Sequence, residues 1–308
     1  MSRIAVAGAL TISVSRRVET FPVPLRTSEV HNGGLGVAPG GTGWLVARTL
    51  QGLGDEVVLA TYVGRDPLGA VALGALREHG LAGPGTLRCS TQPRAVVLYD
   101  RDGNRSGVSD LRSTPRLRYP AERFEAAIDG CEFAVLTNIE FTTSLIPVAV
   151  RRGLPFATDV HVIGDVESAH NRPWLLAAHV LACSHERLRC SPEDWVRQVW
   201  RRFGTPVVLV GCGAGGAVVG VRATGDIWQV RPATPRGVRC QNGAGDTLLG
   251  SFVHHYLAAG DAVRAARNAV LSAGWFIGAA PDRARPLSAA GLARLRARHG
   301  LPAASKLG

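Results

Sequence analysis

Lysine is almost absent from this sequence, and its absence excludes several classes of enzyme. Of the 35 Lys and Arg residues, only Lys306 is a lysine, and it lies close to the end of the 308-residue chain. Schiff-base aldolases, pyridoxal-phosphate enzymes, Walker-type P-loop proteins and protein kinases all need a lysine amine in the active site. We therefore expect none of these classes here.

Aromatic residues are also few, at 6%, and no run of arginines exceeds two, although the formal net charge is +11. A surface that binds nucleic acid usually clusters its basic residues and stacks aromatic rings on the bases. We therefore interpret the charge as scattered arginine and expect no nucleic-acid partner. The charge would still help to attract a phosphorylated small molecule.

Paired cysteines and long apolar runs are missing as well. The six cysteines form no CxxC pair, and none has a histidine at zinc spacing, which is typical of reduced cysteines in a cytosolic protein. No apolar run approaches 18 residues, so we expect no membrane span. The N-terminal segment alternates like a buried strand and lacks a small-x-small cleavage site, so we expect a cytoplasmic protein without a signal peptide.

What the sequence does contain is an alternation of short apolar runs and helical patterns. The apolar runs predict strands at 4–8, 57–63, 134–137, 155–160, 180–183 and 206–210. The helical patterns predict helices at 43–53, 67–79, 121–128, 142–152 and 192–203, and a C-terminal helix with a frayed tail in the last 20 residues. This alternation indicates an α/β fold with a mainly parallel sheet covered on both faces.

Two segments interrupt the alternation. Residues 11–35 carry β-branched residues without a helical period, and residues 88–112 read as a hairpin that turns at Asp102–Gly103–Asn104. We expect these two insertions to pair into a small β-layer outside the main sheet.

The strongest local signal is the stretch NGAGDT, residues 242–247, which is followed by the helical pattern LLGSFVHHYLAAG. A turn of small residues at a helix start points several free N–H groups at one place, and with the helix dipole it forms an anion site. Asp246 in that turn is placed to take a proton from a nucleophile, which suits phosphoryl transfer. The alternative is a plain helix cap with glycines for packing. Gly260 would end this helix, and Asp261 would cap the next.

Together with three other segments, this stretch resembles the ribokinase/PfkB family of carbohydrate and nucleoside kinases. CQNGAGD at 240–246 is similar to the C-terminal signature of that family, and GGTGWLVARTLQGLG at 40–54, followed by VGRDPLG at 63–69, to its N-terminal signature. VGCGAGGA at 210–217 is similar to a nucleotide-side element. The resemblance implies a ribokinase-like three-layer domain over residues 1–308, with insertions 11–35 and 88–112 forming a lid.

The resemblance also implies residue roles on the phosphate and nucleotide side. Asp246 would be the catalytic base, and Gly243, Ala244 and Gly245 would form the anion hole. Gly211, Gly213 and Gly216 would flank ATP, and Asn268 would lie near the adenine unless it is a polar residue on a helix surface. Glu186 would order water around Mg²⁺, although Cys183 stands where the family motif has Asn.

On the acceptor side, the resemblance implies contacts from the Gly40–Gly41 pair, from Glu140 and from Asp159; alternatively, Glu140 is a surface charge and Asp159 caps the next segment. Two positions depart from the family pattern: Ser13 stands in place of a sugar-binding Asp, and Leu45 in place of an Asn. Leucine cannot hydrogen-bond a hydroxyl, and serine cannot accept two hydrogen bonds as a carboxylate does, so we expect an acceptor other than ordinary ribose. Cys240 and Gln241 replace the residues that hold a monovalent cation in some members, which argues against K⁺ activation.

The sequence is compatible with three functions. The leading hypothesis is an ATP-dependent kinase that phosphorylates a hydroxymethyl group of a small sugar, modified sugar or nucleoside, with a homodimer through the lid. The alternative is a catalytically weak binding or regulatory protein of the same fold. An oxidoreductase would rest only on GCGAGG at 211–216, which lacks the acidic residue expected in a first βαβ unit.

Overall fold

The computed structural model describes residues 1–30 and 32–307. Within these residues, ten strands form the central sheet, in the spatial order β14-β13-β12-β11-β10-β9-β8-β1-β4-β5. Their bounds are β1 Arg3–Ala7, β4 Glu56–Gly64, β5 Thr86–Cys89, β8 Phe133–Leu136, β9 Phe156–Val162, β10 Val180–Ser184, β11 Val207–Gly211, β12 Ala217–Val221, β13 Asp226–Val230 and β14 Ala304–Leu307. All six predicted strands are therefore present, with small shifts at their ends.

The seven strands from β5 to β11 run parallel, and β12, β13 and β14 add an antiparallel edge. This edge was not predicted. The expectation of a frayed C-terminal tail was wrong, because residues 304–307 pair with β13, from Val230↔Ala304 to Ile227↔Leu307. The tail is ordered by strand pairing that its own sequence does not reveal.

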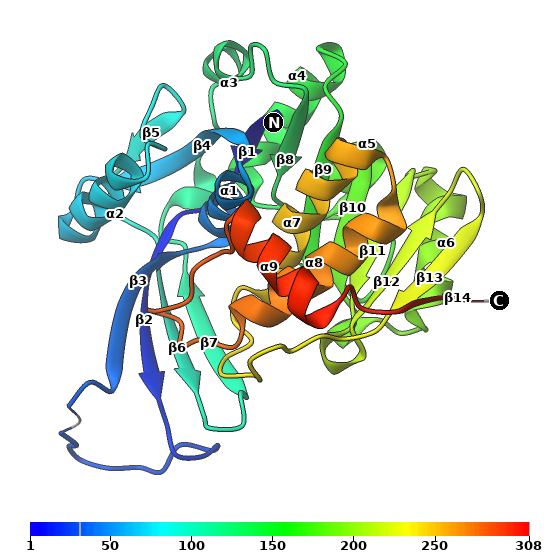
Figure 1. Ribbon diagram of the computed structural model, residues 1–308. Helices are drawn as coiled ribbons and strands as arrows, with labels where there is room; N and C mark the ends of the chain where they lie inside the picture. The colour runs from blue at the N-terminus through cyan, green and yellow to red at the C-terminus, as the bar shows by residue number, and fades with distance from the viewer. Residues whose placement is uncertain (31, 308) are drawn as a thin grey trace.

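Helices cover both faces of the sheet (Figure 1). Their bounds are α1 Thr42–Leu53, α2 Pro67–Glu78, α3 Ala121–Ala127, α4 Ile146–Arg151, α5 Arg172–Ala177, α6 Pro192–Phe203, α7 Ala244–Ala259, α8 Ala262–Phe276 and α9 Ala289–His299. The predicted helix 142–152 is split into a 3₁₀ turn, Glu140–Leu145, and the short α4. The C-terminal helix was predicted, and the observed α9 is its first part.

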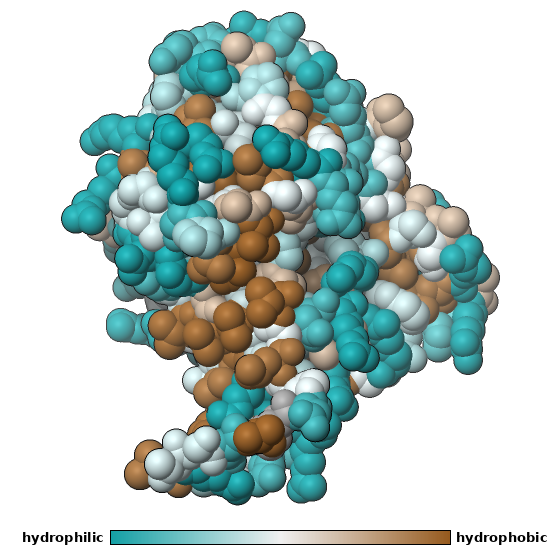
Figure 2. All heavy atoms as spheres, turned by 90° about the vertical axis from the view of Figure 1, so that its left-hand side faces the viewer, coloured by the Kyte–Doolittle hydropathy of each residue, from teal (hydrophilic) through white to brown (hydrophobic). Residues whose placement is uncertain are grey.

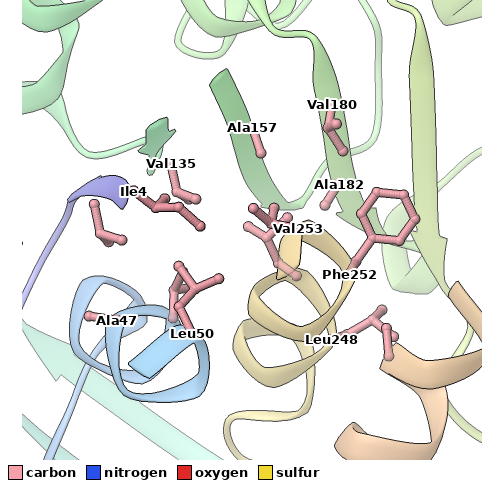
Figure 3. Close-up of a cluster of buried hydrophobic side chains, with 14 of the residues drawn as sticks. Ile4, Ala47, Leu50, Val135, Ala157, Val180, Ala182, Leu248, Phe252 and Val253 are labelled. Carbon is pink, nitrogen blue, oxygen red and sulfur yellow. The ribbon is translucent and has the colours of Figure 1, made fainter. Parts of the chain in front are cut away.

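The core follows the alternation of side chains along the strands. In β1, Ile4 and Val6 face the layer of α1, α2, α7 and α8, while Ala5 and Ala7 face the layer that contains α3 and α4. A strand buried on both faces must be apolar at every position, which explains the continuous apolar runs. Figure 3 shows α1 and α7 side by side over the sheet, with Leu50 and Val253 directed toward Ile4 and Val135.

The small second sheet, called the lid from here on, has the order β3-β2-β6-β7. Its strands are β2 Thr11–Arg17, β3 Leu35–Gly40, β6 Arg94–Tyr99 and β7 Arg105–Asp110, so both insertions contribute to it. β6 and β7 form the hairpin around residues 100–104. The hairpin turn lies on the body of the molecule, because a Cβ at Gly103 would be 2.7 Å from Val238 Cγ1.

In the described part of the chain, no helix is long and apolar enough to cross a bilayer.

Candidate active site

The candidate site lies where the parallel strands end and α7 begins. Asp159 lies near the end of β9, Glu186 just after β10, and Gly213 just after β11. Carboxyl ends of parallel strands meet at one edge of a sheet, and ligands of open α/β folds usually bind there. The lid strand β2 and the start of α1 approach the same edge through the contacts described below.

The turn before α7 requires glycine. Gly243 is the N-cap of α7, with φ 81°, a left-handed conformation that favours glycine over residues with a Cβ. A Cβ at this position would lie 2.7 Å from Phe276 Cε1 and 3.0 Å from Leu45 Cδ1. Leu45, at one of the two positions that depart from the family pattern, therefore lies directly against the predicted anion hole.

The hydrogen bonds of the turn correct one detail of the predicted anion hole. The N–H of Ala244 donates to the carbonyl of Gln241 at 3.2 Å, so this group is already engaged. Among the described residues, none accepts a hydrogen bond from the N–H of Gly243, Gly245 or Asp246. These free donors at the start of a 16-residue helix are the ones available to an anion.

Asp246 lies in the first turn of α7 and is partly buried. Burial raises the pKa of its carboxyl, and the nearby charge of Asp159 raises it further. A protonated His161, the hydroxyl of Thr42 and the guanidinium of Arg105 act in the opposite direction on the same pKa. The carboxyl of Asp246 therefore has a raised pKa and lies among several charged and polar groups, which is typical of a functional site.

Asp159 and His161 project from β9 toward the turn. Asp159 is 5% exposed, and its Oδ2 would lie 3.6 Å from a Cβ at Gly245. Its Oδ1 accepts the N–H of His161 at 2.7 Å, and its Oδ2 lies 3.6 Å from His161 Nδ1. Asp159 therefore lies beside the turn before α7, and its contact with an acceptor stays a prediction.

His161 was missed by the sequence analysis. It has φ 54°, a left-handed conformation that is uncommon for a residue with a side chain, although less so for His, Asn and Asp than for others. Such conformations persist only where the surroundings impose them and are frequent at functional sites. The sequence signal was its place two residues after Asp159, on the same edge.

The predicted nucleotide-side glycines form the turn between β11 and β12. Gly216, with φ 84°, packs on the backbone of residues 230–232. Gly213 faces His185, whose Nδ1 lies 3.1 Å from the carbonyl oxygen of Gly211. Glu186, which follows His185, is exposed. The glycine turn and Glu186 therefore lie at neighbouring strand ends, β11 and β10.

Asn268 is not brought to this edge. It is 1% exposed in α8; its amide donates to the carbonyl of Arg264 at 2.8 Å, and its Oδ1 accepts from Arg296 of α9 at 3.3 Å. Neither the adenine contact nor the helix-surface position expected from the sequence fits these contacts. The helix α9 packs over Asn268 and supplies Arg296 as its partner, which explains why this residue is buried and not on the surface.

On the acceptor side, Ser13 lies on β2, where its hydroxyl is 3.3 Å from that of Thr11. A Cβ at Gly40 would be 2.9 Å from Ser13 Oγ, and Gly41, with φ 90°, begins α1. Glu140 is the first residue of the 3₁₀ turn that follows β8; it is half-exposed, and its Oε1 lies 3.6 Å from His170 Nδ1. The lid strand and the start of α1 are thus in contact.

Cys240 precedes the turn and is 2% exposed, in an apolar cluster with Val97, Tyr99 and Ala280. Burial raises the pKa of its thiol. An apolar cluster around a thiol offers no oxygen ligand for a cation from this side chain.

No protein-family model matches the sequence, and a search of curated proteins finds no match. Solved structures, in contrast, match over almost the whole chain. A microbiome-derived acarbose kinase has a TM-score of 0.85 and 25% identity, covering 96% of this chain and 99% of its own.

Two further solved structures show the same likeness at lower identity. The Burkholderia thailandensis nucleoside kinase in complex with inosine has a TM-score of 0.76 and 16% identity, covering 97% of this chain and 99% of its own. The Arabidopsis thaliana ribokinase complexed with ribose and ATP has a TM-score of 0.76 and 16% identity, covering 96% and 98%. The sheet order, the lid and these matches agree: the chain has the ribokinase-like fold of the carbohydrate and nucleoside kinases.

Proposed function

We propose that this protein is an ATP-dependent kinase that phosphorylates a hydroxymethyl group of a small sugar, modified sugar or nucleoside. One observation carries the proposal: Asp246 lies in the first turn of α7, beside backbone N–H groups that have no partner among the described residues. A base and an anion site in one turn suit the transfer of a phosphoryl group to an alcohol.

In the proposed reaction, the carboxylate of Asp246 accepts the proton of the acceptor hydroxyl. At the same time, the oxygen of that hydroxyl forms a bond to the γ-phosphorus of ATP. The bond between that phosphorus and the β,γ-bridging oxygen breaks, and its electron pair stays on ADP. The N–H groups of Gly245 and Asp246 stabilise the negative charge on the transferring group. The lid, which already touches the body at Gly103 and Val238, excludes water.

Mg²⁺ is the metal that such a reaction needs. In residues 1–30 and 32–307, no group of three or more His, Cys, Asp or Glu side chains could hold a metal ion. Mg²⁺ is usually bound by substrate phosphates, several waters and one or two carboxylates, without an all-protein cage, so the residues present fit it. Glu186 would hold one of its waters, and the ion would neutralise phosphate charge.

The experiment that tests the function measures ADP release from ATP and Mg²⁺ across a panel of acceptors. Ribose, fructose, inosine and adenosine cover ordinary sugars and nucleosides, and acarbose covers the activity named for one structural neighbour. Transfer is established when the acceptor gains one phosphoryl group by mass spectrometry. If the wild type binds an acceptor but transfers no more phosphoryl group than an Asp246→Asn variant does, the result would favour the alternative of a catalytically weak binding protein.

The acid limb of the pH–rate profile should report Asp246. The carboxyl must be ionised to accept a proton, so kcat/KM falls as the pH drops through its pKa, which lies above the ordinary 3.8. His161→Gln removes a basic group that lowers this pKa, so the limb should move to higher pH. Asp159→Asn removes a carboxylate that raises it, so the limb should move to lower pH.

The two variants control each other, because they alter one contact pair with opposite electrostatic signs. Arg105 and Thr42, the other groups that act on Asp246, stay unchanged in both. A shift of the limb in the same direction for both variants, or none in either, contradicts the assignment of that limb to Asp246.

A homodimer through the lid is the expected assembly. Val37, Val14, Val96 and Val108 are paired across the four lid strands in one row and are 61%, 38%, 49% and 71% exposed. Figure 2 shows apolar side chains gathered on this side of the molecule. An apolar row of this kind marks an association surface, and a second lid is the complement that a two-fold dimer supplies.

Light scattering after size exclusion tests this assembly. The wild type should have about twice the 32.5 kDa chain mass, and Val96→Arg with Val108→Arg should have the single mass. Val71→Arg with Val150→Arg places the same charges on exposed valines of α2 and α4 and should leave the mass unchanged. A wild-type monomer, or a dimer that survives the lid substitutions, would refute the proposal.

A further inference from the structure

A groove lies outside the candidate active site, between α9 and the two segments 235–236 and 283–288. Its volume is about 750 Å³, within the range of small-molecule sites. It is lined by Pro235, Arg236, Trp275, Arg283, Arg285, Pro286, Leu287, Ser288, Gly291, Arg294, Leu295, Arg298 and His299. No residue of the 210–217 or 240–246 segments belongs to the lining, so this is a different site.

The lining carries five arginines and one histidine, and no aspartate or glutamate. The one ion pair that these six residues make within the described chain is that of Arg283 with Asp282, at 3.9 Å and largely exposed. Arg285 donates to the carbonyls of Asp282 and Ala284 instead. The positive charge of Arg285 therefore remains unbalanced. It also acts on Arg48, whose pKa is lowered mainly by burial and next by the charge of Arg285.

Part of the groove is rigid. The Arg236 guanidinium lies 4.0 Å from the ring centroid of Trp275, and its Nε donates to the Trp275 carbonyl at 2.7 Å. Gly278 has no Cβ, and one placed there would collide with the Arg236 side chain. Arg294 and Arg298 are four residues apart on α9, so they project from one face of that helix. The groove thus combines a fixed guanidinium with two arginines that project from one face of α9.

We propose that this groove binds a small anion that carries two or more phosphate groups. Guanidinium forks match phosphate oxygens in a bidentate manner, and several unbalanced arginines need several negative charges. A monoanion would leave most of the groove's charge uncompensated. Trp275 is the only aromatic ring of tyrosine, tryptophan or phenylalanine in the lining, and Arg236 covers it, so base stacking along a nucleic acid is not favoured here.

Inorganic pyrophosphate is the probe for this proposal, and titration calorimetry with the full chain at fixed ionic strength measures its affinity. Arg294→Ser with Arg298→Ser should weaken binding at least about tenfold, the loss expected when charged hydrogen bonds to phosphate are removed. Arg77→Ser with Arg201→Ser is the matched control. It removes the same charge from exposed positions on α2 and α6 and should change the affinity by less than about twofold.

Trp275 gives a local readout. Pyrophosphate should change the tryptophan emission of the wild type, and Trp275→Phe should abolish that change while calorimetric binding persists. Equal affinity in the wild type and the Arg294/Arg298 variant overturns the proposal, as does an equal loss in both arginine variants.

Discussion

Replacing Asp246 by asparagine should lower turnover by about two to four orders of magnitude, the usual contribution of a positioned general base. Asparagine has nearly the same shape, and its amide oxygen can still accept the hydrogen bond of Thr42 that acts on the carboxylate. The free N–H groups of the turn are unaffected, so ATP affinity and melting temperature should stay close to those of the wild type. Single-turnover kinetics on the preferred acceptor measure the effect.

The matched control is Asp261→Asn. Asp261 caps α8, where its side chain accepts the N–H of Arg264 at 2.9 Å, and asparagine caps helices about as well as aspartate. This variant makes the same chemical change at the next helix start and should keep full activity. Near-native turnover in a folded Asp246→Asn protein would remove Asp246 from the mechanism.

The wild type should phosphorylate ribose or fructose poorly, because Leu45 stands beside the catalytic turn. A sugar hydroxyl that faces Leu45 loses its water and gains no partner, which costs roughly 1–3 kcal/mol, or about 5- to 150-fold in binding. Leu45 lies against Gly243, so the penalty falls next to the reacting group. Leu45→Asn combined with Ser13→Asp should therefore raise kcat/KM for ribose and lower it for the native acceptor.

Each single variant belongs in the same experiment, since Ser13 and Leu45 could contact one pair of hydroxyls and their effects would then not add. Melting temperatures separate a change of specificity from a loss of packing, because Leu45 also packs on the core. If the wild type already phosphorylates ribose with ordinary efficiency, the argument from Leu45 fails. Glu140 or Asp159 would then have to hold the sugar.

The sequence predicted the features that depend on local pattern. A continuous apolar run, such as residues 4–8, is enough to predict a strand that is buried on both faces. The glycine-rich turn before Asp246 likewise predicts that a helix begins there. The observed caps of α7 and α8 at Gly260 and Asp261 were predicted for the same reason. Local chemistry determines these positions, so local sequence reveals them.

Features that depend on distant contacts were not predicted. β14 is short and half-exposed, and its strand conformation comes from pairing with β13, more than 70 residues earlier in the chain. Asn268 looks like a surface residue in its helix, yet α9 covers it. The left-handed backbone of His161 is fixed by the end of β9 and Asp159. For β14 and Asn268 the decisive partner is remote in sequence, whereas the contact of His161 with Asp159 is local and was missed.

The position of the single lysine has a practical consequence for labelling. Lys306 lies on β14 at the edge of the central sheet, where its Nζ is 2.6 Å from Asp226 Oδ1 and its side chain is 57% exposed. An amine-reactive dye therefore has one side-chain target, on the edge strand, besides the chain's α-amino group. Because β14 is the strand farthest from β1 and β4 in the sheet order, a fluorophore on Lys306 labels the opposite edge of the sheet and leaves the turn before α7 chemically unmodified.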